Sequence, residues 1–153
     1  MKTLFLDIDV LLDVLFDRAP RADSAAALWA AVETRKARGL LTAQAVSTLH
    51  ALMKSARGGA FADRGVSDLL AVFNVARVSE AVLNAALSLR LAAFDDAVSA
   101  AAAAAARCDL LVTSEPVRFR GSTVEVASPG EALVRLSRPR ARARRPRRSA
   151  GPG

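Results

Sequence analysis

Short apolar runs alternate along the chain with longer segments of helical period. Residues 3–6 form a continuous apolar run that ends at Asp7, and the apolar residues 110–112 mark a second predicted strand at 109–113. A continuous apolar run bounded by polar residues is typical of a strand buried on both faces of a sheet. Weaker signals of the same kind predict strands at residues 40–43, 75–78 and 123–126.

The segments between these runs favour helices. Apolar spacing predicts one or two helical turns at 10–16 and helices at 22–38, 44–55, 67–73, 80–90, 94–107 and 129–136. Gly39 stands where the helix at 22–38 would stop, and Ser79 stands where a capping residue would precede the helix at 80–90. Alternating strands and helices predict an α/β fold, a three-layer α/β/α sandwich around a mostly parallel sheet of four to five strands.

The distribution of charge divides the chain into a domain and a tail. Residues 138–153 hold seven of the 22 basic residues and no acid, so the remaining 15 basic and 15 acidic residues sum to zero. We expect a single domain at residues 1–137 and a disordered basic tail at 138–153. The tail either binds RNA phosphates without specificity or is a solvated extension, and the folded domain lacks the excess of basic residues that usually marks nucleic-acid binding.

The composition of the chain also indicates the cellular compartment in which it is found. Asp7, Asp9 and Asp13 interrupt the apolar N-terminus, and the alanine run at 100–106 is too short to span a bilayer. The single cysteine, Cys108, excludes an intrachain disulfide and is expected to be a small core residue. We therefore expect a cytoplasmic protein with no membrane association.

The candidate chemistry lies in carboxylates at the ends of the predicted strands. Asp7 and Asp9 follow the first strand, at the carboxyl end where open parallel sheets place their ligands. Glu115 follows the strand at 109–113, and Asp95 and Asp96 open the alanine-rich helix. If these three places converge, four to six carboxylates of the chain face one cleft.

Clustered carboxylates repel one another and resist burial, and a hard divalent cation removes that conflict. Mg²⁺ or Mn²⁺ held there polarises a phosphoryl oxygen and lowers the pKa of a bound water, which is the chemistry of phosphodiester hydrolysis. The hydroxyls of Thr48, Thr113 and Ser114 are candidates for binding the substrate phosphate. The alternatives are that Asp95 and Asp96 are ordinary first-turn acids and that Glu115 is a solvated loop residue.

In order and spacing, segments of this chain resemble the PIN domain family. PIN domains open with a strand that ends in an aspartate followed shortly by Asn or Asp, as in MKTLFLDIDVLLDVLFDR. Their second strand and helix are similar to LLTAQAVSTLHALM, and their last strand and helix to VEVASPGEAL. A helix opened by an aspartate, then a strand ending in a Thr-x-Asn or Thr-x-Asp turn, is similar to AFDDAVSAAAAAAARCDLLVTSEPVRF. The resemblance spans about residues 1 to 136.

The resemblance implies a function. PIN domains are largely ribonucleases dependent on Mg²⁺ or Mn²⁺, and many are toxins of toxin–antitoxin pairs. By this resemblance Asp7 and Asp96 are the central metal ligands, Asp9 stands where Asn is common, and Glu115 stands where Asn or Asp is common. Asp95, beside Asp96 at the start of the predicted helix, is a further candidate ligand, and Asp7, Asp96 and Glu115 are the candidate catalytic residues. The resemblance also implies an RNA substrate, an antitoxin that binds near the cleft and a homodimer.

Two positions depart from the family pattern. Thr48 stands where many PIN domains carry a glutamate, and Ala93 stands where one subgroup often carries an acid. These departures keep open a second hypothesis, a catalytically degenerate PIN domain that binds RNA or protein.

A third hypothesis is a phosphatase, because LFLDIDVLL is similar to the first motif of haloacid dehalogenases. In that family the first aspartate, here Asp7, is the nucleophile and the second, here Asp9, is the acid/base. Val10 occupies the position of the usual glycine, and no later lysine motif is evident.

Overall fold

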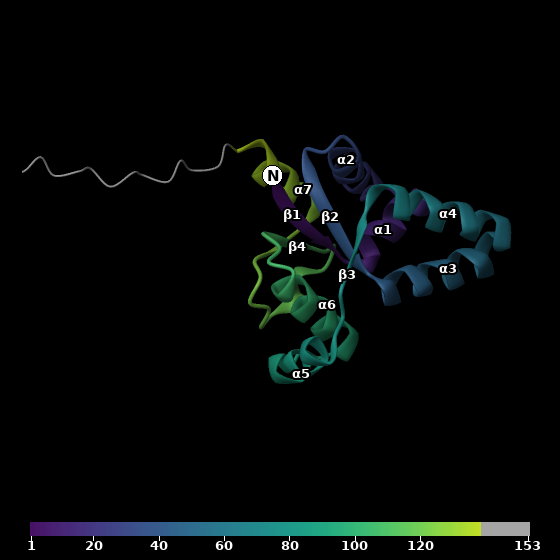
Figure 1. Ribbon diagram of the computed structural model, residues 1–153. Coiled ribbons are helices and arrows are strands. Elements are labelled where there is room, and N and C mark those ends of the chain that lie inside the picture. The colour runs from purple at the N-terminus through teal and green to yellow at the C-terminus, as the bar shows by residue number, and fades with distance from the viewer. Residues whose placement is uncertain (139–153) are drawn as a thin grey trace, which may run out of the picture.

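The computed structural model describes residues 1–138 and confirms the predicted α/β fold (Figure 1). The last 15 residues of the expected tail, 139–153, lie outside the described residues. In chain order the elements are β1 (Lys2–Leu6), α1 (Ile8–Leu15), α2 (Ala22–Glu33), β2 (Ala37–Thr42), α3 (Ala43–Arg57), α4 (Gly59–Val72), β3 (Asn74–Ala76), α5 (Glu80–Leu89), α6 (Phe94–Ala105), β4 (Leu110–Val112), the 3₁₀ helix η1 (Pro116–Phe119), β5 (Val126–Ala127) and α7 (Pro129–Ser137).

The five strands form one parallel sheet in the order β3-β2-β1-β4-β5. The strand with the most continuous apolar run, β1, lies at the centre between β2 and β4. This position explains its composition, because a central strand of a parallel sheet is covered on both faces. The chain turns outward from β1 in both directions, so the carboxyl ends of β1 and β4 flank the place where such sheets bind ligands.

Alternate residues of the central strands point to opposite faces, and each face has its own core. Leu4 and Leu6 belong to one buried cluster with residues of α1, α2, α3, α4 and α7. Phe5, between them, belongs to a second cluster with residues of α5 and α6. Figure 1 shows the same division, with α5 and α6 together on one side of the sheet. The three layers therefore follow from the two-residue period of β1.

Helix α6 approaches the sheet closely because its inner face is built from alanines. Five of them, Ala97, Ala100, Ala101, Ala102 and Ala103, are buried in the cluster that contains Phe5 and Leu111. Small side chains shorten the distance between a helix and the surface that it covers. The amino end of α6, which carries Asp95 and Asp96, consequently lies against the carboxyl edge of the sheet.

The predicted helix at 22–38 was wrong at its end. Helix α2 stops at Glu33, Arg35 adopts a left-handed conformation with φ 59°, and the chain enters β2 at Ala37. Gly39 therefore lies inside a strand, where a Cβ atom would stand 2.5 Å from Phe73 Cδ1 and 3.0 Å from Val32 Cγ1. The glycine is required by packing of the Phe73 ring and not by helix termination.

Two other boundaries also differ from the predicted ones. Helix α4 begins at Gly59, well before the predicted residue 67, and strand β5 is only Val126–Ala127. The early part of α4 was hidden by its glycines; Gly65 faces α3, where its missing side chain leaves room for Met53. The cap at Ser79 is confirmed, since its hydroxyl accepts a hydrogen bond from the Val82 N–H at 3.3 Å. Within residues 1–138, no helix is long and apolar enough to span a membrane.

Replacing Gly39 by alanine tests the packing argument. We expect Gly39→Ala to lower the free energy of unfolding by about 1–3 kcal/mol, because the Phe73 ring is buried and packed edge-on against Trp29 at 5.0 Å and has little room to move. Urea unfolding measures the change. Gly130→Ala is the matched control, because a Cβ atom there meets nothing within 4 Å. Equal stability of the two variants would contradict the proposed contact.

Candidate active site

The acids expected to converge lie at the carboxyl edge of the sheet. Leu6 pairs with Val112 in the parallel register of β1 and β4, which places Asp7 beside Thr113. The Asp7 N–H donates to the Val112 carbonyl at 2.9 Å, so the sheet fixes the backbone of this aspartate. Its side chain starts at the entry to α1 and faces the cleft.

A threonine orients the Asp7 carboxylate. Asp7 is only 4% exposed, and its Oδ2 accepts a hydrogen bond of 3.0 Å from the buried Thr113 hydroxyl. The same hydroxyl accepts from the Glu115 N–H at 3.1 Å, which directs its proton toward Asp7. Thr113 was expected to bind substrate, but its contacts make it a residue that positions Asp7.

Arg118 joins the three aspartates. It lies on η1, and its Nε and Nη2 donate to the two carboxylate oxygens of Asp96 at 3.2 and 2.6 Å. Nη1 donates to Asp9 Oδ2 at 2.5 Å, and Nη2 lies 3.2 Å from Asp7 Oδ2. Carboxylates from the β1–α1 junction and from the first turn of α6 therefore meet around one guanidinium. The sequence led us to expect Asp7, Asp9 and Asp96 at one cleft, but around a metal ion and not around an arginine.

Burial and charge act on this cluster in opposite directions. Burial and, to a smaller extent, the nearby charge of Asp9 raise the pKa of Asp7 to about 6, against the lowering effect of Arg118. Hydrogen bonds to Asp96 and the charges of the three aspartates raise the pKa of Arg118, so its guanidinium stays charged. The charged form of Asp7 is thus costly in this site even with Arg118 in contact.

The other predicted site residues differ in their relation to the cluster. Asp95 is exposed and accepts a hydrogen bond of 3.0 Å from Gln44 Nε2, and both line the cleft with Thr48. Ser114 instead donates to the buried Asp13 at 3.2 Å. Glu115 is exposed and does not line the cleft, so the structure does not bring its carboxylate together with the aspartates.

The cleft has a volume of about 350 Å³. Its polar lining comes from the carboxyl ends of β1 and β2, the first two turns of α3 and α6, and η1: Asp7, Thr42, Gln44, Thr48, Asp95, Asp96, Ser99 and Arg118. Reading the sequence missed Arg118, because the residue lies on a short 3₁₀ helix after β4 with no periodic signal. Its sequence signal is limited to a basic residue three positions after the Thr-Ser-Glu segment that follows β4.

The donor set fits a hard divalent cation. Asp7, Asp9 and Asp96 offer only carboxylate oxygens, which Mg²⁺ and Mn²⁺ prefer, and all three already reach a single cation. With Arg118 between them, however, residues 1–138 contain no group of three or more acidic, histidine or cysteine side chains arranged to hold a metal ion. Metal binding therefore requires the acids to close around a smaller cation than the guanidinium.

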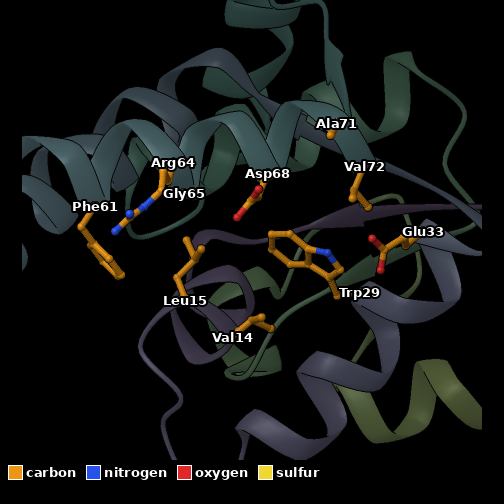
Figure 2. Close-up of a pocket in the computed structure, with 10 residues that line it drawn as sticks. All are labelled: Val14, Leu15, Trp29, Glu33, Phe61, Arg64, Gly65, Asp68, Ala71 and Val72. Atoms are coloured by element: carbon orange, nitrogen blue, oxygen red, sulfur yellow. The ribbon is translucent and has the colours of Figure 1, made fainter.

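A larger pocket lies away from these acids. It has a volume of about 620 Å³ and is lined by residues of α1, α2 and α4, with Trp29 and Leu15 facing Arg64 and Asp68 across it (Figure 2). None of the carboxylates that contact Arg118 lines it. Its size alone does not make it the reactive site.

Cys108 does not have the surroundings of an activated nucleophile. Cys108 is buried, as expected, and burial together with the charge of Asp109 raises the pKa of its thiol to about 11. The thiol stays protonated and is therefore a poor nucleophile.

Comparison with known families decides between the two resemblances. The model of the PIN domain family matches residues 3–115, three quarters of the chain and all of the cluster except Arg118. The chain belongs to the PIN domain family. This assignment disfavours the haloacid dehalogenase hypothesis. The basic side chain that lines the cleft in the described residues is also an arginine, Arg118, and not the lysine of a phosphatase motif.

Solved structures share the fold of this PIN domain at low sequence identity. VapBC2 from Rickettsia felis, bound to a DNA fragment from its promoter, aligns with TM-score 0.66 and 12% identity over 82% of this chain and 98% of that chain. FitAcB from Neisseria gonorrhoeae aligns with TM-score 0.62 and 17% identity over 83% and 98%. VapC20 from Mycobacterium tuberculosis, described as a sarcin-ricin loop cleaving toxin, aligns with TM-score 0.58 and 18% identity over 71% and 86%. No curated protein sequence matches the chain.

The raised pKa of Asp7 predicts how stability depends on pH. The folded protein holds the Asp7 proton more tightly than the unfolded chain does, with a pKa of about 6 against 3.8, so the contribution is present at low pH and is lost as pH rises through 6. We expect the unfolding free energy of the wild-type PIN domain to fall by about 1 kcal/mol more than that of Asp7→Asn between about pH 5 and about pH 7.5.

Urea unfolding of the wild type and Asp7→Asn at both pH values makes this measurement. Asp23→Asn is the control, because Asp23 is an exposed acid of α2 outside the cleft. If the unfolding free energies of all three proteins change equally with pH, burial does not raise the pKa of Asp7 in the folded protein.

Proposed function

We propose that this PIN domain is a divalent-metal-dependent endoribonuclease. The observation that carries the proposal is the meeting of the Asp7, Asp9 and Asp96 carboxylates on one cation at the carboxyl edge of the sheet. Acids from two distant segments, the β1–α1 junction and the first turn of α6, share one cation, a geometry that solvation alone does not require. Because the PIN domain family is composed largely of nucleases, we infer that the reaction is hydrolysis of a phosphodiester bond.

Each residue has a role in this proposal. Asp7 and Asp96, with Asp9, hold Mg²⁺ or Mn²⁺, and Asp95 and Glu115 are further candidate ligands from the rim. A divalent cation supplies a Lewis acid for the scissile phosphate and a lowered pKa for an attacking water. Glu115 retains a proposed catalytic role only if its loop moves toward the aspartates.

The three candidate hydroxyl residues have different roles in this proposal, since one positions Asp7 and the others are candidates for binding the substrate. Thr113 holds the Asp7 carboxylate in one orientation through its hydrogen bond. Thr48 lines the cleft and is exposed, which suits contact with an RNA phosphate. Ser114 is a weaker candidate for substrate, since its hydroxyl is engaged with Asp13.

One observation favours a second candidate, a catalytically degenerate PIN domain that binds RNA or protein. Arg118 stands at the position between the acids that a metal ion would take, and Thr48 stands where many PIN domains carry a glutamate. If Arg118 is a permanent substitute for the metal, the cluster is a structural ion-pair network. The two candidates differ in whether metal-dependent cleavage is measurable.

We also propose that the chain is the toxin of a toxin–antitoxin pair. VapC20, which shares its fold, is described as a toxin, and PIN domains are frequent among the toxins of such pairs. The partner would be a small antitoxin protein. A homodimer stays a prediction from the family resemblance, and a cytoplasmic location stays a prediction from the composition of the chain.

Metal-dependent RNA cleavage tests the enzymatic proposal. We expect the purified chain to cut single-stranded RNA with Mg²⁺ or Mn²⁺ and not with EDTA. We expect Asp7→Asn to lower the rate by at least about a hundredfold, because loss of a central ligand costs more than loss of an outer-shell partner. Gel analysis of a mixed RNA measures cleavage, with a phosphomonoester assayed in parallel.

Asp23→Asn, which changes an acid outside the cleft, is the matched control and should cleave like the wild type. Cleavage that survives EDTA, or that Asp7→Asn retains in full, would remove the proposal. RNA binding without cleavage would favour the degenerate module instead.

Growth of a heterologous bacterium tests the toxin proposal. We expect induced expression of the wild-type chain to arrest growth and Asp7→Asn to permit it, because arrest by an RNA-cutting toxin needs the intact acid cluster. Growth curves at matched protein levels, checked by immunoblot, make the comparison. If both proteins arrest growth equally, the toxicity does not depend on the proposed nuclease site.

A further inference from the structure

Arg118 neutralises the three aspartates with a geometry that does not suit a metal ion. Its guanidinium presents three nitrogens to three carboxylates, at distances of 2.5 to 3.2 Å. A single Mg²⁺ ion needs its oxygen ligands at about 2.0–2.1 Å from one point. Since Arg118 holds the carboxylates around an extended planar group, they are too dispersed to surround a point charge.

Charge makes the two occupants exclusive as well. A guanidinium left among the aspartates would stand beside a divalent ion of the same sign, inside a cleft where Asp7 and Asp96 are buried. Like charges at such short distance and in partial burial repel strongly. Entry of the metal therefore requires the Arg118 side chain to leave the carboxylates.

The local structure allows that movement without loss of the core. Arg118 belongs to a four-residue 3₁₀ helix, and 26% of its side chain is exposed. Its neighbour Val117 is 61% exposed, whereas the next residue, Phe119, is 1% exposed and anchors η1 in the core beside α6. Turning outward would cost the guanidinium its contact with the Phe119 ring, whose centroid lies 5.3 Å from Arg118 Cζ, but would leave the buried ring itself in place.

We propose that Arg118 is a built-in competitor of the catalytic metal, so that metal affinity is set by how often its side chain leaves the three aspartates. The inference rests on the proposed metal-dependent function and adds a residue that controls metal binding. In the absence of metal the guanidinium stabilises the buried acids. A divalent cation displaces it, and the apparent affinity for the metal is reduced by the small fraction of molecules in which Arg118 is turned out.

Calorimetric titration with Mn²⁺ tests the competition on the full chain. We expect Arg118→Ala to bind Mn²⁺ about tenfold to a hundredfold more tightly than the wild type, which corresponds to a turned-out state populated at about 1–10%. Arg120→Ala is the matched control. It removes the same charge from an exposed side chain two residues away that does not touch the aspartates, and its affinity should stay within about twofold of the wild type.

A measurement on the wild type covers the case in which Arg118→Ala does not fold. The Arg118 Nε–H donates to Asp96, so its ¹⁵N resonance should be visible and protected from solvent exchange without metal. On addition of Mg²⁺ we expect this resonance to lose protection and shift as the ion pair opens. Arg118→Ala identifies the resonance by its disappearance, and if that variant is not folded, Arg118→Lys does so.

The outcomes separate this inference from the proposed function. Tighter binding in Arg118→Ala alone, or release of Nε–H by Mg²⁺, supports the competition. Metal binding and RNA cleavage that are the same in the wild type and Arg118→Ala, with Nε–H protected throughout, overturn the inference and leave the nuclease proposal standing. Failure of every variant to bind Mn²⁺ or Mg²⁺ overturns both and makes Arg118 a permanent substitute for the metal.

Discussion

The burial of one carboxylate at the end of the central strand organises the site. The sheet fixes the backbone of Asp7 and its side chain is only 4% exposed, so its charge is compensated mainly from within the protein. The Thr113 hydroxyl supplies a hydrogen bond and Arg118 supplies a positive charge. Removal of either partner leaves a buried charge with less support, which is the costly case for ion pairs inside proteins.

The rest of the fold brings the remaining acids to this point. The alanine face of α6 packs directly on Phe5 and Leu111, and this close contact carries Asp96 to the sheet edge. Asp9 arrives on the first turn of α1, immediately after β1. A bulkier side chain on the inner face of α6 would move Asp96 away from Arg118, so core packing and site geometry are coupled in this protein.

Stability and function make opposite demands on the cluster. Three aspartates around one site are unfavourable without a cation, and Arg118 relieves that repulsion when no metal is present. The same ion pairs oppose the metal that the proposed reaction needs. An arginine on a short, partly exposed 3₁₀ helix suits both demands, because it can be displaced while the buried Phe119 keeps the loop in place.

The sequence alone determined the parallel α/β sheet, the acids at the carboxyl ends of β1 and β4 and the family resemblance, because these depend on local patterns of apolar and charged residues. It misplaced the end of α2 and the role of Gly39, since a residue that must be small to admit the distant Phe73 ring carries no local mark of that contact. Only the tertiary structure showed that Thr113 positions Asp7, that Glu115 stays outside the cleft and that Arg118 joins the three aspartates. Those contacts span from 22 to 111 residues of chain, so they exist only after the strands and α6 have packed together.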